Sequence, residues 1–158
     1  MKKRNITELL IFVVSAELVG ALSGLLAGNM KQFYQSLEKP PLSPPSWLFP
    51  VIWSILYAVM GITAYLVRRS EAEERLEKCA YLWYGAQLLL NFLWSIVFFR
   101  FHAIDTALVI ALLLIVAVIG MIWTFGKVRK SAGWWNVPYL LWLLFAAYLN
   151  AGVLLLNS

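Results

Sequence analysis

Five long apolar runs constrain what this chain can fold into more than any other feature. They span about 6–28, 46–67, 79–99, 103–125 and 134–156, and an α-helix needs roughly 20 residues to cross a bilayer. Backbone groups in lipid must form hydrogen bonds within their own segment, so each run is expected to be helical. The sequence therefore predicts one all-α integral membrane domain, residues 1–158, built as a five-helix bundle.

The composition supports this class. Hydrophobic residues make up 62% of the chain and charged residues 13%, whereas a soluble domain carries about 25% charged residues. A basic N-terminus followed by an apolar run also occurs in signal peptides. The first run is long, however, and carries Glu17 in its middle, which favours a membrane span. The single cysteine, Cys79, allows no disulfide within the chain.

Lysine and arginine are distributed unevenly between the two ends of the expected bundle. Ten lie before the first run or in the second and fourth connections, and three lie in the first and third connections. Cytoplasmic loops are enriched in these residues, so we expect a cytoplasmic N-terminus and an external C-terminus. The net charge of +5 then requires no nucleic acid as a partner.

The first connection, NMKQFYQSLEKPPLSPP (29–45), differs from the others because it combines aromatic residues with two Pro-Pro pairs. Its last part, KPPLSPP (39–45), favours extended conformations and is already stiff when free. It predicts a long ordered loop that acts as a lid, with Tyr34 pointing into the mouth of the bundle. We expect Ser46 to cap the next helix, which places Pro50 in the first turn, where a missing N–H costs little.

Three of the expected helices carry stripes of aromatic, amide and small residues at helical spacing. The stripes are Trp53, Tyr57, Gly61 and Ala64; Tyr84, Gln87, Asn91, Trp94 and Ser95; and Trp135, Tyr139, Trp142, Ala146 and Asn150. Amides within a membrane need partners, so these side chains either form hydrogen bonds between helices or line a cavity. Gln87 fits both interpretations, and Asn91 with Ser95 fits a cavity wall at least as well.

The middle of the first run holds an ionisable residue, Glu17, which makes it a functional candidate; the alternative is a protonated, hydrogen-bonded carboxyl. The same run has small residues at four-residue spacing, typical of close helix packing: Ala16, Gly20, Gly24 and Gly28. The sequence shows no cluster of metal ligands, no Ser-His-Asp set and no nucleotide-binding glycine motif. A metal site, a hydrolase and an ATPase are therefore not indicated.

Three segments resemble the TspO/MBR family: 39–61, with its Pro-Pro pairs and aromatic helix, QLLLNFLWSIVFF (87–99) and PYLLWLLFAAYLN (138–150). This family comprises the tryptophan-rich sensory proteins of bacteria and the translocator protein, or peripheral-type benzodiazepine receptor, of mitochondria. The resemblance covers the whole chain. It implies a five-helix bundle, usually a homodimer, with a ligand pocket. With Tyr57 added from the stripe of the second helix, the implied ligand-binding residues are Tyr34, Trp53, Tyr57, Asn91, Ser95, Trp142 and Ala146.

The resemblance implies a membrane receptor or sensor that binds porphyrin-type tetrapyrroles and isoquinoline-carboxamide or benzodiazepine drugs. One alternative is a light- and oxygen-dependent porphyrin-degrading enzyme that uses Trp53 and Trp142. The other is a tetrapyrrole transporter, which the lack of an evident internal repeat does not favour. No cofactor is required, and porphyrin would be ligand or substrate.

The chain also departs from the family pattern. Relatives commonly have Trp-Tyr where this chain has Phe33-Tyr34, and many have Trp where it has Leu42. No Lys or Arg follows Tyr148, although the cholesterol motif of animal members requires one. Sterol transport is therefore not supported.

Overall fold

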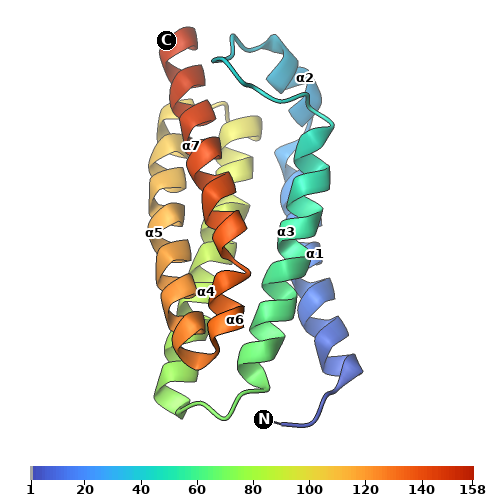
Figure 1. Cartoon of the computed structure of the whole chain (residues 1–158). Helices are drawn as coiled ribbons and strands as arrows, with labels where there is room; N and C mark the ends of the chain where they lie inside the picture. Colours follow the sequence, from blue (N-terminus) through green and yellow to red (C-terminus); the bar gives the residue numbers. More distant parts are fainter. Residues whose placement is uncertain (1) are drawn as a thin grey trace.

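The computed structural model describes residues 2–158, and all regular structure in this range is helical. The segments are α1 (Ile6–Ala27), α2 (Met30–Ser36), α3 (Leu48–Arg68), α4 (Glu74–Ser95), the π-helical turn η1 (Ile96–Arg100), α5 (Ile104–Val128), α6 (Lys130–Trp134) and α7 (Val137–Asn157). Taking α4 with η1 and α6 with α7, five helices in the described range are long and apolar enough to cross a membrane. The predicted five-helix membrane bundle is confirmed. The N-terminus and α6 lie at one end, and α2 and the C-terminus lie at the other (Figure 1).

Two local predictions need correction. The third spanning helix begins at Glu74, five residues before the expected start at 79, because Glu74 and Glu77 favour the positive N-terminal end of a helix. Ser46 does not cap α3: the helix has no side-chain cap, and the Leu48 N–H donates to the Pro45 carbonyl at 3.1 Å. Pro50 is still the third residue of the helix, where its missing N–H leaves no hydrogen bond unmade.

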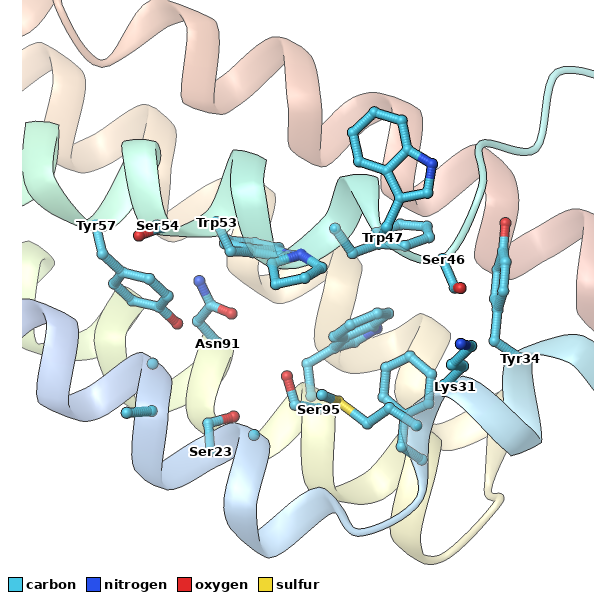
Figure 2. Close-up of a pocket in the computed structure, with 18 of the residues that line it drawn as sticks. Ser23, Lys31, Tyr34, Ser46, Trp47, Trp53, Ser54, Tyr57, Asn91 and Ser95 are labelled. Atoms are coloured by element: carbon cyan, nitrogen blue, oxygen red, sulfur yellow. The ribbon is translucent and has the colours of Figure 1, made fainter.

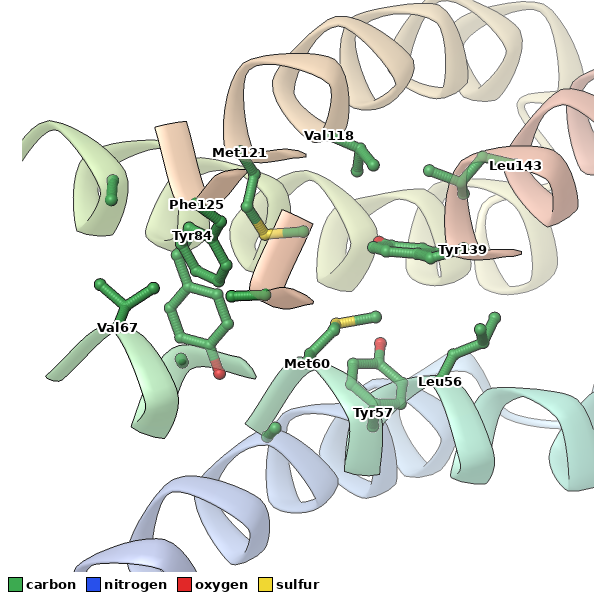
Figure 3. Close-up of a cluster of buried hydrophobic side chains, with 14 of the residues drawn as sticks. Leu56, Tyr57, Met60, Val67, Tyr84, Val118, Met121, Phe125, Tyr139 and Leu143 are labelled. Atoms are coloured by element: carbon green, nitrogen blue, oxygen red, sulfur yellow. The ribbon is translucent and has the colours of Figure 1, made fainter. Parts of the chain in front are cut away.

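The end of the bundle that carries α6 is tightly filled, and we call it the packed half. Its core lies between α3, α4, α5 and α7 (Figure 3) and includes Met60, Val67, Tyr84, Met121 and Phe125. Small residues let the backbones approach closely: a Cβ atom at Gly61 would lie 2.6 Å from the Cα atom of Val13. Neither backbone can move away without disturbing this core.

Charged groups fasten the N-terminal segment to this end of the bundle. The Glu8 carboxylate pairs with the Arg69 guanidinium and lies 3.7 Å from that of Arg68. Arg68 also pairs with Glu77 at 3.1 Å, and the Asn5 N–H donates to the Tyr65 hydroxyl at 2.8 Å. These contacts join α1 to the α3–α4 connection.

Candidate ligand cavity

At the opposite end the bundle is hollow, and we call this end the cavity half. A cavity of about 540 Å³ lies between α1, α2, the N-terminal half of α3 and the end of α4 with η1. Figure 2 shows it from the side, with α3 above α1 and with Lys31 and Tyr34 at one end. The volume falls in the range of small-molecule sites, about 300–1,000 Å³. The lining residues are Glu17, Gly20, Ala21, Ser23, Gly24, Met30, Lys31, Tyr34, Ser46, Trp47, Phe49, Pro50, Trp53, Ser54, Tyr57, Asn91, Trp94, Ser95 and Phe99.

Aromatic rings make up much of the wall. Trp53 and Tyr57 follow each other one turn apart on α3, with ring centroids 5.8 Å apart. Trp94 lines the cavity from α4, and its indole N–H donates to the Asn150 carboxamide oxygen at 3.0 Å. Asn150 in turn donates to the Ile104 carbonyl at 3.0 Å. This chain of hydrogen bonds fixes the Trp94 ring, so one side of the cavity is already organised without a ligand.

A buried hydrogen-bond network joins α4 to α7 beside the cavity. The Tyr139 hydroxyl accepts from the Asn91 carboxamide at 2.9 Å and donates to the Gln87 carboxamide oxygen at 2.8 Å. Gln87 therefore serves contact between helices, one of the two predicted roles for the amide stripe. Asn91 serves both roles, because it also lines the cavity, with its carboxamide oxygen directed into it (Figure 2).

The first connection forms an ordered roof made of α2 and residues 37–45, which we call the strap. The Tyr34 hydroxyl donates to the Pro44 carbonyl at 2.6 Å, and the Tyr34 ring packs edge-on against Phe49, with centroids 5.2 Å apart. Burial raises the pKa of Tyr34, an effect only partly offset by its contact with the Ser43 hydroxyl. The phenol therefore stays protonated and remains a donor.

The strap is also fastened to α7, far along the sequence. The Glu38 N–H donates to the Asn157 carboxamide oxygen at 3.1 Å, and the Asn157 carboxamide donates to the Glu38 carbonyl at 2.8 Å. The Tyr148 hydroxyl donates to the Pro41 carbonyl at 2.9 Å. The strap packs so closely that a Cβ atom at Gly152 would lie 2.5 Å from the Pro40 ring.

The structure brings five of the seven predicted binding residues to the cavity wall: Tyr34, Trp53, Tyr57, Asn91 and Ser95. Trp142 and Ala146 are not among the lining residues. The Trp142 ring lies behind the wall, with its centroid 6.5 Å from that of Trp53 and 5.8 Å from that of Phe49. Sequence spacing placed them on a common stripe, but residues of α3 stand between α7 and the cavity. A ligand-binding role for both stays a prediction.

The cavity also uses residues that sequence reasoning did not assign to it. On α1 the lining residues are Glu17, Gly20, Ala21, Ser23 and Gly24, although the small residues were interpreted as helix packing. The available signal was the carboxyl on the same helical face as these small residues. Lys31 lines the cavity from α2, and nothing in the sequence separated it from the other lysines.

No group of three or more His, Cys, Asp and Glu residues within 2–158 could hold a metal ion. The lone His102 is exposed, and its ring stacks on Phe33, with centroids 3.9 Å apart. The cavity wall itself is mainly apolar and aromatic, with a few polar groups.

The fold and the cavity define a class of protein: a five-helix integral membrane protein with an aromatic cavity roofed by its first connection. The sequence model of the TspO/MBR family matches residues 11–156, and the chain belongs to this family. It is 32% identical over 153 residues to Protein CrtK of Rhodobacter capsulatus, covering 97% of this chain and 94% of that protein.

Two further relatives, one bacterial and one mammalian, are similar over a somewhat shorter stretch. The tryptophan-rich protein TspO of Chlorobaculum tepidum is 36% identical over 125 residues, 79% of each chain. The translocator protein of Ovis aries is 37% identical over 128 residues, 79% of this chain and 75% of that protein. The similarity to bacterial and mammalian members alike confirms the family that the sequence resembles.

Proposed function

We propose that this protein is a membrane receptor or sensor that binds a porphyrin-type tetrapyrrole in the cavity beneath the strap. The observation that carries the proposal is a cavity of about 540 Å³ lined by several large aromatic rings and few polar groups. A flat macrocycle suits such a slot, because it offers large faces for stacking and apolar edges for burial. Flat isoquinoline-carboxamide and benzodiazepine drugs would compete for the same rings.

Binding would rest on stacking and burial. Stacking of a nucleic-acid base on an aromatic ring, a rough analogue, is worth about 1–3 kcal/mol. No histidine lines the cavity, so metal-free porphyrin should bind at least as well as haem. We further propose the bacterial cytoplasmic membrane as the location, the N-terminus on its cytoplasmic side, and a homodimeric assembly; accessibility labelling and native mass spectrometry test these.

The test is a titration of the purified protein in lipid nanodiscs with protoporphyrin, followed by quenching of tryptophan fluorescence. We expect saturable binding, weakened about tenfold by Trp53→Ala because one stacking face is lost. Trp123→Ala is the matched control: Trp123 is 61% exposed on α5 and lies outside the cavity. Quenching that does not saturate, or equal losses in both variants, would contradict the proposal.

A second candidate function is supported by the position of Trp142. Its indole ring lies directly behind Trp53, and its N–H is buried without a hydrogen-bond partner among the described residues. Two adjacent indoles could pass an electron to a photoexcited porphyrin, leaving an indole radical cation, and molecular oxygen would add to the porphyrin radical anion that forms. Loss of porphyrin absorbance under light in air, slowed by Trp53→Phe and by Trp142→Phe and absent without oxygen, would support this enzyme; light-stable bound porphyrin would exclude it.

A further inference from the structure

An acidic and a basic side chain stand at the two ends of the cavity. Glu17 lines it from the middle of α1, and Lys31 lines it from α2. Glu17 lies ten positions before Ala27 at the end of that helix, which at a rise of 1.5 Å per residue amounts to about 15 Å. Glu17 lies one turn from Gly20, where a Cβ atom would be 2.5 Å from the Tyr57 ring, and Figure 2 shows Tyr57 at the end of the cavity opposite Lys31.

Within residues 2–158, no ion pair or side-chain hydrogen bond joins Glu17 or Lys31 to another residue. The other cations near the mouth are engaged. The Lys39 ammonium donates to the Tyr34 and Leu37 carbonyls, and Arg100 donates to the Leu26 carbonyl. The cavity therefore offers an unpaired cation at its mouth and an unpaired carboxyl at its inner end.

We infer that these two residues set the orientation and the substrate class of the ligand. It is a flat macrocycle that carries its carboxylates along one edge, and that edge faces Lys31 while the apolar edge lies against Glu17 and Tyr57. This inference rests on the proposed function. Glu17 is then a specificity-determining residue that acts against ligands with carboxylates on opposite edges.

The two ends of the cavity differ in how well they accommodate a ligand carboxylate. A carboxylate in apolar surroundings is costly unless a cation or water accompanies it, and at the mouth the exposed Lys31 supplies a cation. The inner end has no cation among its lining residues. A carboxylate placed there meets a second carboxyl, and two carboxyl groups sharing one site cannot both ionise easily.

Three probes that differ in their carboxylates test this in nanodiscs of phosphatidylcholine. Protoporphyrin IX has two on one edge, its dimethyl ester has no free carboxylate, and coproporphyrin III has four around the ring. We expect the parent to bind protoporphyrin at least tenfold more tightly than coproporphyrin. Lys31→Gln should weaken the binding of protoporphyrin about three- to tenfold and leave the affinity for the ester unchanged. Lys130→Gln, at the far end of the bundle, is the matched control and should change neither.

Glu17→Gln should narrow the preference for protoporphyrin over coproporphyrin about fivefold, with Glu38→Gln as the control, because the side chain of Glu38 is exposed. Glu17→Met provides a second variant if the amide disturbs folding. If Lys31→Gln weakens the acid and the ester equally, or if neither Glu17 variant changes the preference, the inference is wrong while the proposed function stands. If the parent binds none of the three probes saturably, the proposed function itself fails.

Discussion

The packed half and the cavity half share three helices, α1, α3 and α4, yet one is solid and the other hollow. In the packed half the backbones of α1 and α3 touch, since a Cβ atom at Gly61 would lie 2.6 Å from Val13. Further along α1, the Tyr57 ring fills the space next to Gly20. One turn beyond, a Cβ atom at Gly24 would meet only the terminal methyl group of Met30, at 3.7 Å. The two helices therefore diverge toward the strap.

This difference shows that small residues on one helix do not by themselves produce close packing. Gly20 and Gly24 leave room, and the opposite helix decides whether that room is filled by backbone, by a ring or by nothing. In the cavity half α3 contributes large rings that stand along the wall, so the space between the helices stays open.

The largest expected effect is on the backbone contact of the packed half. Gly61→Ala should lower the free energy of unfolding by about 3 kcal/mol, because the added methyl group meets backbone atoms of α1 that cannot move aside. Gly85→Ala is the control, since a Cβ atom there meets nothing within 4 Å. Titration with a denaturing detergent measures both. If Gly61→Ala is as stable as the parent, α1 and α3 do not touch as described.

A smaller loss is expected at the boundary between the two halves. Tyr139→Phe removes the hydroxyl that joins Asn91 to Gln87, leaving buried polar groups unpaired at a cost of about 2 kcal/mol. Tyr84→Phe is the matched control, because the buried Tyr84 hydroxyl has no hydrogen-bond partner among the described residues; it should leave stability unchanged or raise it. Equal losses in thermal unfolding would argue against the network.

On the cavity side, Trp142→Ala should weaken porphyrin binding by about threefold, less than Trp53→Ala, because Trp142 supports the wall without lining it. The Trp142 ring would contribute to binding mainly by holding the Trp53 ring in place, and such an aromatic pair is worth about 0.5–1.5 kcal/mol. Trp123→Ala should have no effect. Fluorescence titration of the three variants gives the order of their affinities. A larger loss of affinity for Trp142→Ala than for Trp53→Ala would indicate that the ligand lies closer to α7.

The smallest expected effect concerns the roof of the cavity. Asn157→Ala removes both hydrogen bonds to Glu38, so the strap should open more often and release ligand about twofold faster. The free energy of unfolding should hardly change. Stopped-flow dissociation measures the release rate, with Ser158→Ala as the control. An unchanged rate would indicate that the ligand does not leave beneath the strap.

The features that the sequence predicts correctly are local. Runs of apolar residues determine the five spans, and the prolines near Pro40 and Pro44 determine an ordered first connection. The early start of α4 at Glu74 was missed because a charged segment predicts exposure and not helix length. The cavity wall on α1 and the place of Trp142 depend on how far α1 and α3 diverge and on which helix stands in between. Such distances arise from packing between distant segments, which periodicity within one helix cannot express.

The pairing of Glu38 with Asn157 has a consequence for how the protein is made. The two residues are 119 positions apart, and chains are synthesised at about 5–20 residues per second, so about 6 to 24 seconds separate them at the ribosome. Throughout that interval the strap has no α7 to dock on. The first four spans therefore enter the membrane before the strap can be fastened to α7, and the arrival of the last helix both completes the bundle and fastens the roof of the cavity.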